Sequence, residues 1–382
     1  MKGLFSHIYP SSVFYGVDAF SNYCTCEILN KSLIVYDPNI EHPVIDQISR
    51  ERKFNYIKSF SQPTLDNASY LADVFSELHF TSIIAIGGGT TIDLVKLGAA
   101  LSSNSSDLSR IKRLSSRAGA LPLAVRDNKY EIIAVPTTVG TGSEVTSTAS
   151  IKVNSKQRLL CMSPALAPKL AIIDSEMTRS LPQVLLRQGI FEVLVRILGS
   201  DCGAESWLPI SSEESIFLSS SIFKFLDRSA EYKLDEVERL CVSILSAETH
   251  LGWSMQGRKL APSPLWIIAD EISSYLGITK IQATTKIFPF WIMRVLSNDI
   301  VWGDKNRLKR HEIMIGNRMN TVSSICEQLK IWGVEPSVTF SLSNSEIESV
   351  AQKIYFRWGG GMPLLGKLTV DDIKSLLTDV FL

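Results

Sequence analysis

The stretch IIAIGGGTTIDLVK at positions 83–96 decides the fold. Four apolar residues run directly into Gly87-Gly88-Gly89, and the residues that follow continue as a helix. A buried strand that ends in a glycine turn and then a helix aims free backbone N–H groups at a bound anion, and glycine lets the backbone come close to it. Because glycine clusters alone are weak signals, a plain strand-to-helix turn is the alternative. The strand and helix on either side both favour a turn that binds a pyrophosphate.

A second motif repeats this design at positions 132–146, IIAVPTTVGTGSEVT. An apolar strand ends here in a loop rich in hydroxyl groups and glycine, which can donate hydrogen bonds to ribose and phosphate oxygens. Two such loops at the ends of neighbouring strands would flank one crevice. The pair therefore predicts a nucleotide site between them.

An acid follows an earlier strand, in Val35-Tyr36-Asp37. A carboxylate in that position can accept hydrogen bonds from the hydroxyls of an adenosine ribose and would repel a 2′-phosphate, which favours NAD over NADP. The alternative is a solvated loop aspartate, so NADP stays possible.

Short apolar runs and helical patterns alternate through the first half of the chain. The runs are 32–36, 82–86, 132–135 and 170–173, and residues 71–78 carry apolar side chains at helical spacing. Continuous apolar runs suit strands that are buried on both faces, and strand–helix alternation predicts a parallel, doubly wound α/β sheet. We expect this dinucleotide-binding domain to cover residues 1–178.

The second half of the chain, residues 179–382, is expected to be an all-helical domain. Long amphipathic patterns begin near 212–214 and 234–236, and Thr369 precedes two acids as a helix N-cap would. The chain has 39 basic and 39 acidic residues among 382, so no uniform field exists to hold a nucleic acid or an anionic membrane. With no secretory signal or membrane-spanning stretch in this sequence, we expect a cytoplasmic protein. Its six scattered cysteines are assigned no role.

These motifs resemble those of the iron-containing alcohol dehydrogenases of the dehydroquinate synthase-like superfamily. Residues 87–96 match Gly-Gly-Gly-Ser-x-x-Asp-x-x-Lys with Thr90 for Ser, and residues 136–144 match Pro-Thr-Thr-x-Gly-Thr-Gly-Ser-Glu. The stretch SPALAPKLAIID at 163–174 is similar as well. The resemblance implies a Rossmann-like N-terminal domain, a helical C-terminal domain, a substrate cleft at their interface and a homodimer.

The resemblance, together with the glycine motifs, implies a set of residues that bind NAD. Arg158 belongs to it because the family usually has a lysine there, near the nicotinamide end of the cleft. The set is Asp37, Gly87, Gly88, Gly89, Thr90, Thr91, Asp93, Thr137, Thr138, Thr141, Ser143 and Arg158.

The family's metal site does not carry over to this sequence. The resemblance implies one Asp and three His around a divalent metal, the first two in Gly-x-x-Asp-Ala-Leu-x-His. This chain reads GIFEVLVR at 189–196, so Glu192 stands for the Asp and Arg196, which has no lone pair to donate, for the His. The family's downstream histidines correspond to Trp266, Asp270 and Lys280. We therefore expect no catalytic iron or zinc at this position.

The substituted residues allow two interpretations. Glu192 and Arg196 share one helix face, and Asp270 and Lys280 should point into the same space. In the first interpretation these four charges form a closed ion-pair network, and Trp266 fills the remaining volume. Alternatively, a cation at the position of the metal polarises a carbonyl, and Lys280 serves as general acid or base. His250 is a candidate proton carrier on a helix that leads toward the cleft. Arg258 and Lys259 either select an anionic substrate at the entrance or form a solvated face.

Two functions of different classes follow. The first is an NAD(P)-dependent, metal-independent oxidoreductase that interconverts an alcohol and an aldehyde or ketone, with Lys280 and Arg196 on the carbonyl oxygen. The second is a catalytically silent nucleotide-binding relative that acts as an accessory or scaffold subunit in a biosynthetic pathway. A third, weaker option keeps a metal elsewhere, bound by Glu192, Asp270 or His250.

Overall fold

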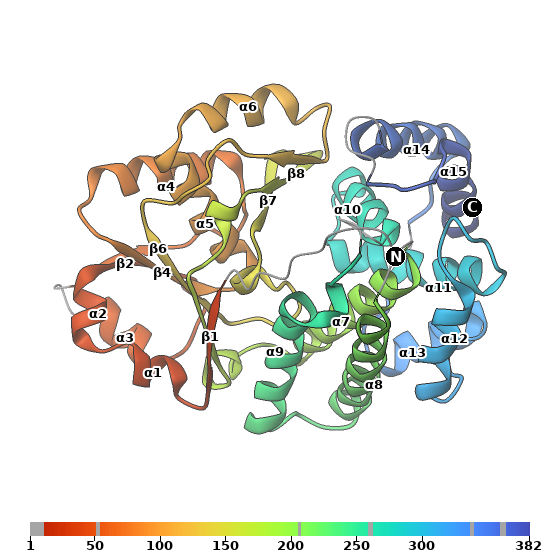
Figure 1. Ribbon diagram of the computed structural model, residues 1–382, viewed down its shortest axis with the longest axis horizontal. Helices are drawn as coiled ribbons and strands as arrows, with labels where there is room; N and C mark the ends of the chain where they lie inside the picture. Colours follow the sequence, from red (N-terminus) through yellow and green to blue (C-terminus); the bar gives the residue numbers. More distant parts are fainter. Residues whose placement is uncertain (1–10, 51–53, 205–207, 259–262, 337–339, 360–363) are drawn as a thin grey trace.

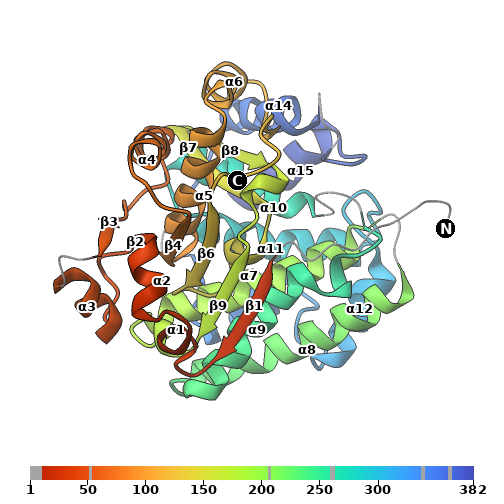
Figure 2. The same ribbon diagram turned by 60° about the vertical axis from the view of Figure 1, so that its left-hand side comes forward.

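A parallel β-sheet forms the centre of the first half of the molecule (Figures 1 and 2). The structure, a computed structural model, describes residues 11–50, 54–204, 208–258, 263–336, 340–359 and 364–382. The six strands of this sheet follow the order β1 (Ser12–Gly16), β9 (Leu170–Asp174), β6 (Glu131–Pro136), β4 (Ser82–Gly87), β2 (Ser32–Tyr36) and β3 (Asn55–Lys58). All pairs are parallel. The predicted runs form β2, β4, β6 and β9, so the prediction of a parallel sheet is confirmed.

Helices cover both faces of the sheet because its strands are apolar on both sides. Leu33 and Val35 pack toward α4 (Leu65–Glu77) and α5 (Gly89–Ser103). The alternate residues Ile34 and Tyr36 pack toward α1 (Ala19–Tyr23), α2 (Cys26–Lys31) and α3 (Pro43–Arg50). Successive strand side chains point to opposite faces, so one continuous apolar run supplies both cores. The doubly wound arrangement is thereby confirmed.

A second, three-stranded sheet lies between the two halves and was not predicted. It has the order β5 (Ala120–Pro122), β8 (Gln157–Met162) and β7 (Thr148–Asn154), with β7 and β8 antiparallel. β7 alternates polar and apolar residues and so presents no continuous apolar run, whereas β8 contains the short apolar run 159–162, which was not interpreted as a strand. The helix α6 (Ser106–Leu114) precedes this sheet.

The second half of the chain is helical (Figure 1). Its helices are α7 (Gln183–Cys202), α8 (Pro209–Glu231), α9 (Glu236–Leu251), α10 (Pro264–Leu276), α11 (Lys280–Leu296), α12 (Lys305–Met314), α13 (Val322–Ile331), α14 (Asn344–Gly359) and α15 (Val370–Phe381). Thr369 caps α15 as predicted, in a capping box with Asp372. In the part of the chain that the structure describes, no helix has the length and apolarity needed to cross a bilayer.

A buried arginine of α14 joins the two halves. The Arg357 Nη2 group donates to the carbonyl oxygens of Ala118 (3.0 Å) and Arg158 (2.5 Å), while Nη1 bonds Glu271 of α10. Both charged side chains are about 1% exposed. Removal of one partner from a buried ion pair strongly destabilises the fold, because the other charge is left uncompensated. The pair of Arg357 and Glu271 therefore holds α14 and α10 against the small sheet.

The expectations for Arg258 are wrong. Its side chain is fully buried in the helical half, where Nη2 lies 2.7 Å from Asp201 Oδ1 and Nη1 donates to the Ser200 carbonyl at 2.6 Å. His311 Nε2 contacts the other oxygen of Asp201 at 3.0 Å. Arg258 therefore contributes neither to a cleft entrance nor to a solvated face, because Asp201 requires a buried cationic partner. Lys259 lies outside the described residues.

Loss of the Asp201 carboxylate should make the free energy of unfolding depend less on pH below about pH 5. Burial alone raises the pKa of Asp201, but His311 and Arg258 outweigh it and hold that pKa at about 2, below the ordinary 3.8. Because the pKa of Asp201 is lower in the folded protein than in the unfolded chain, the carboxylate stabilises the fold fully at a pH above its pKa in the unfolded chain. This stabilisation is lost as the pH falls through its pKa in the folded protein. It amounts to about 2 kcal/mol.

Urea unfolding of wild type and Asp201→Asn between about pH 5 and pH 2 measures this contribution. We expect the variant to be less stable at pH 5 and to lose less stability on acidification. Glu131→Gln, which removes an exposed pair with Lys169, is the control. Identical pH dependence in wild type and Asp201→Asn would contradict the assignment.

Candidate active site

Three loops meet at the carboxyl edge of the large sheet. The strand β4 lies between β2 and β6, so the loops that follow these strands are neighbours. The Asp37 N–H donates to the Ile86 carbonyl at 2.9 Å, and the Thr137 N–H donates to the Gly87 carbonyl at 3.1 Å. The residues predicted separately from three motifs are therefore brought together, at the edge where open α/β sheets bind ligands.

The first glycine turn fits directly against the hydroxyl loop. A Cβ atom added to Gly88 would lie 3.0 Å from Thr138 Oγ1, and one added to Gly89 would lie 3.1 Å from Thr141 Oγ1. Gly88 is the N-cap of α5, so the N–H groups of the next residues, including Thr90, have no acceptor within the helix. This cradle of backbone donors and hydroxyls fits the phosphates of a dinucleotide.

Some of the predicted nucleotide ligands also have partners inside the protein. Asp93 accepts from Ser143 Oγ and, at 2.8 Å, from the Ser150 N–H. The fully buried Lys96 donates to the Ser143 carbonyl at 2.8 Å. Thr91, about 2% exposed, donates to Ser59 Oγ at 2.9 Å. Asp93 and Lys96 thus hold the two motifs together through Ser143, whereas Thr91 bonds the segment after β3. Direct contact of Asp93, Ser143 and Thr91 with a nucleotide stays a prediction.

Asp37 lies at the end of β2 in a turn of its own. Its Oδ1 accepts from the backbone N–H of Asn39 at 3.0 Å and from Asn39 Nδ2 at 2.9 Å. Within the described residues Oδ2 has no hydrogen bond, so one carboxylate oxygen remains for a ribose hydroxyl. The contact of Asp37 with a ribose stays a prediction.

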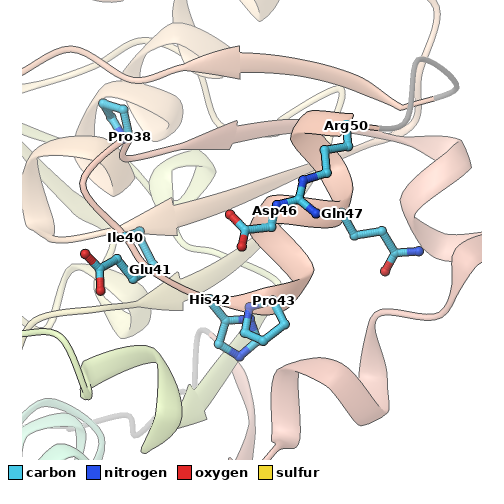
Figure 3. Close-up of a pocket in the computed structure, with 8 residues that line it drawn as sticks. All are labelled: Pro38, Ile40, Glu41, His42, Pro43, Asp46, Gln47 and Arg50. Carbon is cyan, nitrogen blue, oxygen red and sulfur yellow. The ribbon is translucent and has the colours of Figure 1, made fainter.

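A cavity of about 860 Å³ follows this turn and was not predicted. Figure 3 shows residues of the loop after Asp37 facing residues of α3 across it. Its lining residues are Pro38, Ile40, Glu41, His42, Pro43, Asp46, Gln47 and Arg50. The cavity adjoins the adenosine side of the predicted site and is distant in sequence from the substituted metal position.

Several of the residues that the resemblance assigns to the family's metal position contact one another in the structure. Glu192 lies on α7, Trp266 on α10, and Lys280 is the first residue of α11. The Lys280 ammonium bonds Glu192 Oε1 and lies 4.9 Å from the centroid of the Trp266 ring. From the other side, Arg158 Nη1 of β8 lies 3.9 Å from Asp270 Oδ1 of α10. These contacts form a mixed cluster of cations and carboxylates beside an aromatic wall.

These residues do not fit iron or zinc. The Lys280 ammonium already neutralises Glu192 and would repel a second cation, and Trp266 and Arg196 offer no lone pair. Among the residues that the structure describes, no group of three or more His, Cys, Asp and Glu side chains is arranged to hold a metal ion. We derive no chemical step through a metal at this position.

The electrostatics of the cluster distinguish its two carboxyl groups. Burial raises the pKa of Glu192, but Lys280 and Arg196 outweigh burial and hold that pKa below the ordinary glutamate value. Burial also raises the pKa of Asp270, and Arg158 and Lys280 only partly offset it. Glu192 is therefore the ionised partner of Lys280, whereas Asp270 is the carboxyl that protonates more readily.

Arg196 and His250 lie against the second glycine loop. The Arg196 guanidinium donates to the Gly140 carbonyl and, at 2.7 Å, to Thr249 Oγ1 of α9. Burial, and after it the charge of Arg196, hold the pKa of His250 well below 6.5, so its imidazole is neutral at pH 7. Its Nε2 is buried without a hydrogen-bond partner in the described part of the chain. The role of His250 as proton carrier stays a prediction.

The sequence reasoning missed two residues that position the loop, Ser246 and Thr249 of α9. Ser246 Oγ accepts from the Gly140 N–H at 3.1 Å. No motif marks either residue, because each acts across more than 50 positions of the chain.

Solved structures of several alcohol dehydrogenases and aldehyde reductases have this fold. An archaeal halo-thermophilic alcohol dehydrogenase from a Red Sea brine pool superposes over 100% of both chains, with a TM-score of 0.79 and 17% identity. Sulfoacetaldehyde reductase from Bifidobacterium kashiwanohense, solved in complex with NAD+, superposes over 99% of both chains, with a TM-score of 0.75 and 16% identity.

The family model of the iron-containing alcohol dehydrogenases matches residues 10–175. The chain therefore has the fold of that family and its sequence signature in the nucleotide-binding half, and the predicted resemblance is confirmed. It is 33% identical to phosphonoacetaldehyde reductase from Streptomyces viridochromogenes over 40% of this chain and 38% of that relative. It is 23% identical to NADH-dependent butanol dehydrogenase B from Clostridium acetobutylicum over 78% and 77% of the two chains. The match to the Streptomyces relative spans well under half of that protein.

Substitution of Gly142 by alanine should damage the site. Gly142 has a φ of +63°, and an added Cβ would lie 2.1 Å from His250 Nε2. The left-handed backbone and the clash together should cost about 2–4 kcal/mol of unfolding free energy. Urea unfolding provides the measurement.

Gly277→Ala is the matched control, because its φ is +68° with no atom within 4 Å of an added Cβ. It should lose only the backbone contribution of about 1–2 kcal/mol. In the double variant Gly142→Ala/His250→Ala, the part of the unfolding free energy that the clash costs should be regained. Equal losses in Gly142→Ala and Gly277→Ala would refute the close contact.

Proposed function

We propose that this protein is an NAD(H)-dependent oxidoreductase that interconverts an alcohol and an aldehyde or ketone without a catalytic metal. The observation that carries the proposal is the Lys280 ammonium, held by Glu192 and the Trp266 ring at the position where the family binds its metal. Both nucleotide motifs remain intact beside it. The fold supports this class of reaction, as do the alcohol dehydrogenases and aldehyde reductases among its relatives.

The nucleotide would be held along the carboxyl edge of the sheet. The N–H groups at the start of α5 and the hydroxyls of Thr138 and Thr141 would bind its phosphates. Asp37 would accept hydrogen bonds from the adenosine ribose and disfavour a 2′-phosphate, which makes NAD the expected cofactor and NADP the alternative. The bound nicotinamide supplies or accepts the hydride. Arg158 would lie at this reactive end with its positive charge.

Lys280 would polarise the carbonyl oxygen of the substrate. Its ammonium has three N–H donors, of which one is directed at Glu192. A remaining N–H can donate to the substrate oxygen and stabilise the negative charge that develops there during reduction. Lys280 can then transfer a proton to that oxygen, which completes the alcohol, and regain one from solvent. In this arrangement the lysine replaces the Lewis acid of the metal-bearing relatives.

The second candidate is a catalytically silent nucleotide-binding subunit, and one observation favours it. Most charges of the cluster already have a partner: Lys280 pairs with Glu192, Arg158 with Asp270, and Arg196 binds the Gly140 carbonyl. A network satisfied in this way stabilises the helical half without any substrate. The two candidates share nucleotide binding and differ in turnover.

The purified protein should bind NADH in metal-free buffer that contains a chelator. Titration followed by the nicotinamide fluorescence should saturate, and elemental analysis should find iron and zinc well below one per chain. NADPH should bind more weakly because of Asp37. The absence of NADH binding at millimolar concentration would contradict the proposal. One iron or zinc ion per chain would show that the protein is a metal-dependent enzyme of this kind.

Lys280→Ala should lower the rate of carbonyl reduction by about 10²- to 10³-fold, the usual cost of one donor to a developing oxyanion. Lys286→Ala on the same helix, whose charge acts on Cys326 instead, is the matched control and should keep the wild-type rate. A panel of aldehydes and ketones with NADH provides the assay. If wild type turns over none of them and Lys280→Ala only lowers the melting temperature, the silent subunit is the correct function.

A further inference from the structure

We infer that Arg196 is a positioning residue that holds the second glycine loop in the shape that binds the nucleotide. In this inference the side chain at a former metal-ligand position acts on cofactor binding and not on the substrate carbonyl. The inference deepens the proposed function and rests on it. It replaces the predicted contact of Arg196 with the substrate oxygen by contacts that the structure contains.

Two helices of the helical half hold both backbone groups of Gly140. Its carbonyl accepts from Arg196 Nη2 of α7, and its N–H donates to Ser246 Oγ of α9 at 3.1 Å. The two holding residues are themselves linked by Thr249. Arg196 Nη1 donates to Thr249 Oγ1 at 2.7 Å, and Thr249 Oγ1 donates to the Ser246 carbonyl at 2.6 Å. The loop is therefore clamped at one residue from two sides.

The backbone of α7 lies directly against the loop next to this clamp. A Cβ atom on Gly140 would lie 2.6 Å from the Gly189 carbonyl oxygen, and one on Gly189 would lie 2.4 Å from the Val139 carbonyl oxygen. Arg196 follows Gly189 by seven residues, about two helical turns, so both lie on the same face of α7. The close contact at Gly189 brings the helix near enough for the arginine to reach the loop.

The clamp acts on a loop that needs a constraint from outside. Gly140 and Gly142 have φ values of +106° and +63°, and glycine leaves many other conformations open to the free chain. Between and beside them lie Thr138 and Thr141, whose side chains face Gly88 and Gly89. Fixing Gly140 therefore fixes the hydroxyls that complete the phosphate cradle.

An arginine suits this position better than other cations. Its planar guanidinium can bond a carbonyl and a hydroxyl at once and stays charged when buried. The charge is compensated nearby by Glu192, whose pKa Lys280 and Arg196 together hold below its ordinary value against the opposing effect of burial. Burial raises the pKa of Glu144, and the charge of Arg196 only partly offsets that rise. Because the clamp joins the helical half to the nucleotide loop, nucleotide binding must in turn stabilise the contact between them.

The test is the NADH affinity of wild type, Arg196→Ala and Arg196→Lys, measured by fluorescence titration. Loss of a charged hydrogen-bond donor corresponds to about 10- to 100-fold weaker binding in Arg196→Ala. Arg196→Lys should recover part of the affinity, and added methylguanidine should partly restore binding to Arg196→Ala. A residue that only stabilised the fold would not give recovery of affinity by methylguanidine.

Arg187→Ala is the matched control on the same helix, since Arg187 donates to the Trp332 carbonyl, away from the loop. It should keep NADH affinity within about twofold of wild type. If Arg196→Ala does not fold, Ser246→Ala removes the other arm of the clamp and should weaken NADH binding in the same direction, by about 3- to 10-fold.

The outcomes separate the two proposals. Wild type that binds NADH, with unchanged affinity in Arg196→Ala or, where that variant does not fold, in Ser246→Ala, overturns this inference alone. Wild type that does not bind NADH at all overturns the proposed function together with it. Weakened binding in the clamp variants but not in Arg187→Ala supports it.

Discussion

The close approach of two loops at the carboxyl edge of the large sheet is the constraint on which the site depends. The glycine turn after β4 and the hydroxyl loop after β6 come so near that a side chain at Gly88 or Gly89 would contact Thr138 or Thr141. This approach requires parallel neighbouring strands, because only then do both loops leave the sheet at the same edge. The backbone donors at the start of α5 and the threonine hydroxyls then face one space without further adjustment.

The helical half has a different constraint, which is the burial of several charged side chains close together. An isolated buried charge is costly, and the cost falls only when a partner and hydrogen bonds accompany it. Glu192 and Lys280 satisfy this condition with the Trp266 ring as one wall, while Arg158 and Asp270 pair beside them. Each of these cations therefore has a carboxylate partner. The Lys280 ammonium still has N–H donors that a substrate oxygen could accept from.

The two halves differ in how far they follow the family pattern. The family match covers residues 10–175, which contain both nucleotide motifs. The helical half lies outside that match, and the resemblance alone assigns Arg196, Trp266 and Lys280 to the positions of the family's histidines. The fold nevertheless extends over the whole chain. Apolar packing between helices tolerates many substitutions of similar volume, so a fold can persist after its metal site has changed.

The sequence by itself determined the strands β2, β4, β6 and β9, the helix α4, the cap of α15, the two nucleotide motifs and the absence of histidine between residues 251 and 310. These features depend on local periodicity, on turn chemistry or on the identity of a single residue. Only the tertiary structure decided that Arg196 bonds Gly140, that Arg258 is buried against Asp201, and that a small sheet lies between the halves. Such contacts join residues that are far apart in the chain, and their geometry exists only after the helices and strands have packed. No local pattern of residues encodes them.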